Sequence, residues 1–154
     1  MNPDSILEQI QRDLMSAMKS KDADTLSTLR MLKAALMEAK TKKPRDQALD
    51  RDEQIEVLQR YAKKRRESAE ELGKLGRADL ASREEREIAV TARYLPQALS
   101  EDELRGLVRD AIQRAGAAGP KDAGKVIGAV MGQARGRADG AAVARLVQKI
   151  LKGG

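Results

Sequence analysis

The chain has 154 residues, of which 35% are charged and only 1% are aromatic, and its net charge at pH 7 is +6. It contains no cysteine and no histidine, which excludes disulfide bonds, thiol nucleophiles, imidazole bases and the usual zinc sites. A core without large aromatic side chains must be built from small aliphatic residues on closely packed helices, so the composition predicts an all-α protein. No apolar run reaches the length of a membrane span and the first residues lack a secretion signal, so we expect a cytoplasmic protein without membrane contact.

Helical spacing of apolar residues predicts a bundle of four helices in the first part of the chain, at about residues 5–20, 22–39, 51–75 and 79–94. The predicted apolar stripe of the first helix contains Leu7, Ile10, Leu14 and Met18.

The third predicted helix begins at Asp50 and Glu53, which have the spacing of a capping box. Further along it, residues 63–66 form a basic run that acidic residues one turn later neutralise, and we interpret this run as a solvated face. Arg65 is the exception because it falls in the apolar stripe. It is either a member of an interior ion pair or a contact to something bound.

A domain boundary is predicted at Leu95-Pro96, because proline disfavours helix in the residue before it. This gives an N-terminal helical domain at residues 1–96 and a small three-helix domain at residues 97–154. The second domain begins with Ser100 and Glu103, another capping-box pair. A connector rich in glycine and alanine, residues 115–120, leads to a helix that ends near Arg135, and a final apolar stripe follows at residues 143–151.

Glycines recur at every fourth position from Gly124 to Gly136. Three of them lie inside the predicted helix, where each costs about 1 kcal/mol relative to alanine, and Gly136 is placed to end the helix in a left-handed conformation. The apolar residues form a separate stripe, so a face without side chains, flanked by Lys125 and Arg135, points away from the core. This face suits a phosphate backbone or a second helix. The alternative is a helix of the same chain packed over the glycines.

Basic residues are concentrated toward the C-terminus: residues 100–154 contain ten basic and six acidic residues, against 20 and 18 in residues 1–99. In the last predicted helix, Arg145, Lys149 and Lys152 share one exposed face. A basic surface of this kind attracts polyanions, of which structured RNA is a common cytoplasmic example, although it also serves solubility.

The string Gly-Arg-Ala-Asp occurs twice between helices, at residues 76–79 and 136–139. Glycine closing one helix and aspartate capping the next explains much of this repeat. It does not explain the arginine. Beside the free amide groups of a helix start, Arg137, and less strongly Arg77, would form a small phosphate-sized site.

Several segments in the same order carry a family resemblance: residues 29–35, Lys63, Arg65, Ser68, and residues 76–80, 94–96, 99–104, 124–126 and 136–140. Through them the chain resembles the YqeY-like proteins along nearly its whole length. Its second domain resembles the tail of GatB, the tRNA-handling subunit of the aspartyl/glutamyl-tRNA amidotransferase, a carbon–nitrogen ligase. The resemblance implies an all-helical protein in two parts, the second a tRNA-binding-like module. It does not include the parts of the amidotransferase that perform glutamine hydrolysis or the kinase-like step.

We therefore predict an accessory protein whose C-terminal domain docks on structured RNA, above all tRNA, by phosphate and shape contacts, with a link to tRNA-dependent amidation. The alternative is a protein-interaction module that binds an amidotransferase, an aminoacyl-tRNA synthetase or another translation partner without contacting RNA. An enzyme in its own right is least favoured, since no nucleophile, base or metal cluster is evident, and no cofactor is expected. The predicted nucleic-acid-binding residues are Lys125, Gly128, Gly132, Arg135, Gly136, Arg137, Arg145 and Lys149.

Overall fold

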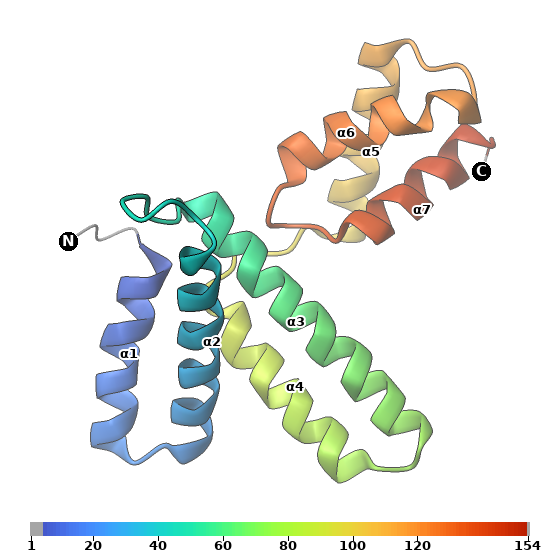
Figure 1. Ribbon diagram of the computed structural model, residues 1–154. Coiled ribbons are helices and arrows are strands. Elements are labelled where there is room, and N and C mark those ends of the chain that lie inside the picture. Colours follow the sequence, from blue (N-terminus) through green and yellow to red (C-terminus); the bar gives the residue numbers. More distant parts are fainter. Residues whose placement is uncertain (1–4, 154) are drawn as a thin grey trace. The chain divides into compact units, whose positions relative to one another are not determined.

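A computed structural model describes residues 5–153, which form seven α-helices, one short 3-10 turn and no strand, as the composition predicted (Figure 1). The opening residues, on which the expectation about a secretion signal rests, lie outside the described part. Two compact units divide the chain between Leu95 and Pro96, and each is treated by itself below. Among the described helices, none is long and apolar enough to cross a membrane.

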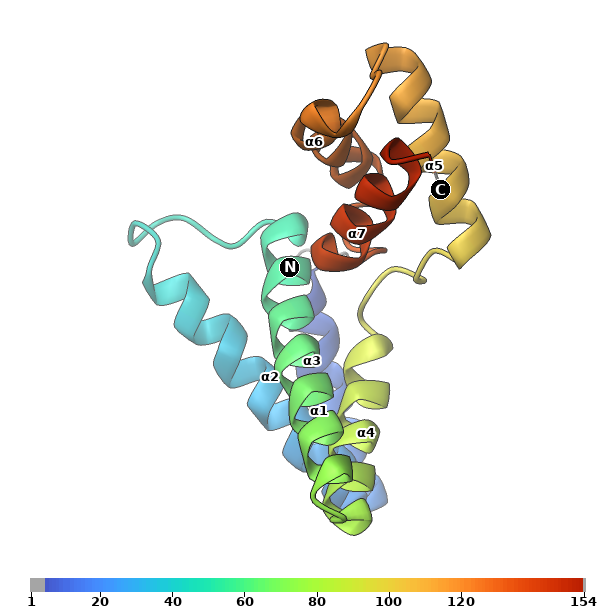
Figure 2. The same cartoon turned by 90° about the vertical axis from the view of Figure 1, so that its right-hand side faces the viewer.

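The N-terminal unit contains four helices that pack as two hairpins: α1 (Ile6–Ser20), α2 (Ala23–Thr41), α3 (Arg51–Lys74) and α4 (Ala78–Ala92). The hairpins meet mainly through α2, which contacts both α3 and α4 (Figures 1 and 2). The predicted capping box of Asp50 and Glu53 is present at the start of α3, and Asp22 caps α2 by accepting a hydrogen bond from the Thr25 N–H.

The core side of α1 agrees with the predicted stripe except at its end. Ile10 is fully buried, and Leu7 and Leu14 are partly buried and pack against the core. The prediction is wrong for Met18, whose side chain is 58% exposed, and it missed Ile6 and Ala17, which are buried. Both sets of residues have helical spacing, so periodicity could not say how far the helix is rotated toward its neighbours. The rotation leaves methionine side chains on the solvent side of the hairpin.

Arg65 takes the first of its two predicted roles. Its guanidinium nitrogens lie 3.4 Å from Glu84 Oε2 and 3.4 Å from Glu87 Oε2, both on α4. The same group stands over the ring of Tyr61, with 4.9 Å between the guanidinium carbon and the ring centre. The other members of the basic run at residues 63–66 are exposed, which confirms the interpretation of a solvated face.

Tyr94 lies at the end of the N-terminal unit, where its buried hydroxyl donates a hydrogen bond to the carboxylate of Asp13 on α1. Burial is the main reason that the pKa of Tyr94 is raised, and the hydrogen bond to Asp13 raises it further. The folded protein therefore keeps this proton at a pH where the unfolded chain, with an ordinary tyrosine pKa near 10, releases it. The contribution of Tyr94 to stability is thus present below about pH 10 and lost as the pH rises above it.

We expect Tyr94→Phe to lower the free energy of unfolding at neutral pH by about 1 kcal/mol, the net value of a hydrogen bond to a partly solvated carboxylate. The same variant should lose stability less steeply than the wild type above about pH 10, because it lacks one of the two tyrosine hydroxyl groups whose pKa is raised in the folded protein. Tyr61, whose pKa burial also raises, accounts for the remaining slope. Urea unfolding at neutral and alkaline pH measures both effects, and identical alkaline slopes in the two proteins would contradict the assignment.

The C-terminal unit is a bundle of three mutually packed helices: α5 (Glu101–Ala115), α6 (Ala123–Ala134) and α7 (Gly140–Leu151). A short 3-10 turn, η1 (Pro120–Asp122), precedes α6. The predicted capping box of Ser100 and Glu103 starts α5, and Gly116 ends that helix in the left-handed conformation. The core consists of small aliphatic side chains: Leu104, Val108, Ala111, Val126, Val130, Ala134, Val143 and Val147.

Candidate nucleic-acid interface

The glycines of α6 lie on its solvent face. Val126 and Val130 are fully buried on the opposite side of the helix, whereas Gly124, Gly128 and Gly132 are exposed. A Cβ added at any of these three glycines would meet no described atom within 4 Å outside the neighbouring backbone. Within the described C-terminal unit, therefore, no helix packs over the glycines, which was the predicted alternative. On this face, the backbone of α6 is accessible to a binding partner.

Lys125 lies on the same exposed face, three residues before Gly128. Nearby, the Ala118 N–H donates a hydrogen bond of 3.0 Å to the carboxylate of Asp122. This backbone hydrogen bond is the main cause of the lowered pKa of Asp122, and the charge of Lys125 also contributes. The carboxylate therefore stays ionised and holds the connector in place at the start of α6.

The cations of α7 are also exposed. Val143 and Val147 are fully buried, while Arg145 and Lys149, one helical turn apart, lie on the other side of the helix. Since α6 and α7 are packed neighbours, the glycine face and these cations belong to two adjacent helices of one unit (Figure 1). We give the name α6–α7 surface to five of the exposed residues of these two helices: Lys125, Gly128, Gly132, Arg145 and Lys149.

The turn after α6 gives a structural reason for one further predicted site residue, Gly136. The helix ends at Ala134, and Gly136 has a φ of +79°, which confirms the predicted left-handed conformation. Gly136 is buried, so the turn alone accounts for this glycine. Arg135 is exposed beside it. Gly136 remains a predicted contact residue, but it lies outside the α6–α7 surface.

Arg137 forms hydrogen bonds with residues of its own unit that are distant in the sequence. Its Nε donates a hydrogen bond of 2.9 Å to the Gln97 carbonyl, and its main-chain carbonyl accepts one of 2.9 Å from the Leu99 N–H. A terminal guanidinium nitrogen also lies 3.9 Å from Glu103. These contacts fix the segment before α5 against the turn between α6 and α7. A phosphate bound to the Arg137 guanidinium would compete with its contacts to Gln97 and Glu103, and the phosphate site there stays a prediction.

In the two copies of the Gly-Arg-Ala-Asp string, the glycines have the same backbone conformation, but the aspartates have different positions relative to the helix that follows. Gly76 and Gly136 both have positive φ values, of 73° and 79°, as expected of glycines that close helices. The expected aspartate cap is wrong for Asp79, which lies inside α4. Asp139 occupies the expected N-cap position of α7, although its side chain makes no capping hydrogen bond in the described structure. Arg77 Nε lies 3.9 Å from Asp79, and the Arg77 side chain is more exposed than that of Arg137.

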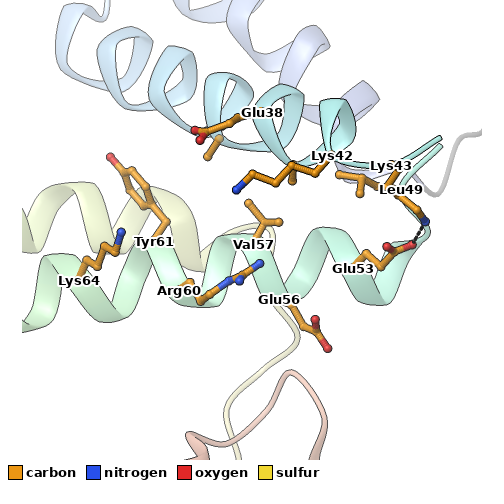
Figure 3. Close-up of a pocket in the computed structure, with 12 residues that line it drawn as sticks. Glu38, Lys42, Lys43, Leu49, Glu53, Glu56, Val57, Arg60, Tyr61 and Lys64 are labelled. Carbon is orange, nitrogen blue, oxygen red and sulfur yellow. Dashed lines mark hydrogen bonds and ion pairs between the residues drawn. The ribbon is translucent and has the colours of Figure 1, made fainter. Parts of the chain in front are cut away.

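A pocket of about 480 Å³ between α2 and α3 was not predicted from the sequence (Figure 3). Its charged lining residues carry both signs: Glu38, Lys42, Lys43, Glu53, Glu56, Arg60 and Lys64. At one end Lys43 Nζ lies 2.6 Å from Glu53 Oε1, and this hydrogen bond is the main cause of the lowered pKa of Glu53. Tyr61 lies at the other end (Figure 3). Because charges of both signs surround it, this pocket has no marked preference for a polyanion.

In the sequence, the lining of this pocket is visible only as pairs of opposite charges one helical turn apart, Glu38 with Lys42 and Glu56 with Arg60. Such pairs are common on any solvated helix, so they do not reveal that two helices face each other across a hollow.

Comparison with known proteins covers nearly the whole chain. The family model described as Yqey-like protein matches residues 7–151. A relative from Pyrenophora tritici-repentis, named altered inheritance of mitochondria protein 41, mitochondrial, is 32% identical over 128 residues, which cover 80% of this chain and 67% of the relative. An uncharacterized protein of Schizosaccharomyces pombe is 35% identical over 89 residues, covering 57% of this chain and 70% of that protein. The chain belongs to the Yqey-like protein family.

Proposed function

We propose that the C-terminal unit docks on folded RNA, with tRNA as the first candidate, through phosphate and shape contacts made by the α6–α7 surface. The observation that carries this proposal is the open glycine face of α6, which no side chain of the described C-terminal unit covers and which lies beside the exposed Lys125. Glycines let a phosphate backbone approach the helix closely, and Lys125, Arg145 and Lys149 supply the positive charge.

Recognition of single-stranded RNA by base stacking fits the chain poorly. That mode needs exposed aromatic side chains on which the bases stack. The two tyrosines, Tyr61 and Tyr94, both belong to the N-terminal unit, and the sequence has no phenylalanine or tryptophan. Contacts to phosphates and to the shape of a folded RNA need no aromatic residue, and they agree with the cationic side chains of α7.

The resemblance of the second unit to the GatB tail supports tRNA as the ligand and suggests an accessory role near tRNA-dependent amidation. This unit would bring an RNA to a partner that performs the chemistry. We place this role in the cytoplasm. One relative is named as mitochondrial, and the same tRNA-binding role would also suit that compartment.

Substituting the exposed glycines separates a structural from a binding role. Because Cβ atoms at Gly128 and Gly132 have open space, Gly128→Ala and Gly132→Ala should each raise the free energy of unfolding by about 1 kcal/mol through helix propensity. The added methyl groups hold a phosphate backbone away from the helix, so tRNA affinity should fall in the double variant although its fold is more stable. Thermal unfolding and titration with bulk tRNA measure the two effects. Unchanged affinity in the stabilised variant would contradict close approach at these glycines.

The open face of α6 also suits a partner helix, which is the alternative function. In that case an amidotransferase or aminoacyl-tRNA synthetase would bind the protein without RNA, and Gly128→Leu would abolish the complex in a pull-down while the fold is kept. Binding through the glycine face would then depend weakly on salt, whereas tRNA binding should weaken steeply as salt rises. A salt series with both kinds of partner therefore distinguishes the two functions.

A further inference from the structure

The hairpin of α1 and α2 carries an apolar groove on its solvent side, with a volume of about 450 Å³. Leu14, Met15 and Met18 line it from α1, and Ala34 and Met37 line it from α2. On each helix these residues follow helical spacing, so one face of each helix contributes a wall. Met15, Met18 and Met37 are 62%, 58% and 40% exposed.

Apart from Leu14, which also packs against the core, the residues that line this groove are not part of the core of the N-terminal unit. The core uses other faces of the same helices, where Ile10 on α1 and Leu29, Leu32 and Leu36 on α2 are almost completely buried. Several long apolar side chains gathered at one exposed place are unusual on a monomer surface and typically mark an interaction site. Methionine suits such a site because its unbranched, polarisable side chain adapts to the shape of a partner.

The charged residues that line the groove have one sign. They are Arg30 and Lys33, both on α2, and no acidic residue is found among the described lining residues. We propose that the α1–α2 groove binds an amphipathic helix of another protein, whose apolar stripe packs on the methionines and whose acidic edge faces Arg30 and Lys33. The bound helix would complete a three-helix arrangement with α1 and α2.

A helix fits this surface better than the other occupants. A second copy of the chain, paired symmetrically through the same groove, would bring Arg30 and Lys33 of both copies into one interface without acidic partners in the lining. An anionic membrane would satisfy the charge, but it presents a flat surface, whereas a hollow between two helices receives the ridge of side chains on a third helix.

The test uses a fluorescent designed peptide of about 20 residues, long enough to form an amphipathic helix, with leucines at helical spacing and glutamates along one edge. A matched peptide has lysines in place of the glutamates. The wild-type protein should bind the glutamate peptide more tightly than the lysine peptide. Arg30→Glu combined with Lys33→Glu should reverse this preference. Met15→Ser combined with Met37→Ser should weaken binding of the glutamate peptide about tenfold, since each change removes apolar surface buried by the partner.

Lys63→Glu combined with Arg66→Glu is the matched control, because it makes the same change of charge at the same spacing on exposed positions of α3. It should leave the preference of the wild type unchanged. The proposal is overturned if the two peptides bind all variants equally. It is also overturned if the methionine substitutions abolish self-association in sedimentation, or binding to anionic vesicles, while peptide binding is unaffected.

Discussion

Reversing the charges of Lys125, Arg145 and Lys149 together is expected to lower the affinity for tRNA on the order of a hundredfold at moderate salt. For each phosphate contact that is lost, binding releases about one counterion fewer, and the favourable entropy of that release is lost with it. All three side chains are exposed on α6 and α7, so their replacement by glutamate leaves the core untouched. Arg137 is left out of this set because it holds the Gln97 carbonyl. Its substitution would loosen the start of the unit as well as remove a charge.

The salt dependence of binding tests the same contacts in a second way. Between about 50 and 200 mM salt, the slope of log affinity against log salt should become shallower by about three units in the triple variant, one for each phosphate contact. Filter binding or fluorescence anisotropy with bulk tRNA measures both the affinity and the slope. An affinity that falls without any change of slope would mean that the three residues do not contact phosphates.

A matched control separates local contacts from net charge. Lys63→Glu, Lys64→Glu and Arg66→Glu together change the net charge by the same amount, at exposed positions of α3 in the N-terminal unit. If the α6–α7 surface binds the RNA, this control should lose far less affinity than the variant of the C-terminal unit. Equal losses in both proteins would show that general electrostatic attraction governs binding, and the proposed interface would be wrong.

Val130→Asp is expected to unfold the C-terminal unit while the N-terminal unit stays folded. Val130 is fully buried in the core that α5, α6 and α7 share. An unpaired carboxylate there costs several kcal/mol, and a unit of about 60 residues has a margin of stability of similar size. Hydrogen exchange followed by mass spectrometry should show loss of protection in α5 to α7 and retained protection in α1 to α4.

Ala129→Asp is the control for this substitution, since it places the same side chain one residue earlier on the exposed face of α6. It should leave protection in both units unchanged. Loss of protection in both units of the Val130→Asp protein would show that they fold as one and would contradict their independence. The same protein should lose tRNA binding and keep binding of the glutamate peptide, because the α1–α2 groove lies in the other unit.

Local sequence signals were sufficient for the helices and their ends. The capping boxes at Asp50 and Ser100, and the left-handed glycine at Gly136, were correctly predicted because each depends on residues within four positions of one another. The all-α class followed from composition, since a chain with almost no aromatic residues has small aliphatic side chains as its core material. The spacing of the glycines was likewise enough to indicate an unusual face on α6.

Tertiary packing decided which of these features are accessible. Helical periodicity could not tell whether the glycine face of α6 meets another helix or solvent, nor that Met18 turns outward in α1 while Ala17 turns inward. It also could not connect Arg137 with Gln97, which lies 40 residues earlier in the chain. These outcomes depend on how each helix is rotated against neighbours that are distant in sequence, and a pattern within one helix contains no information about that rotation.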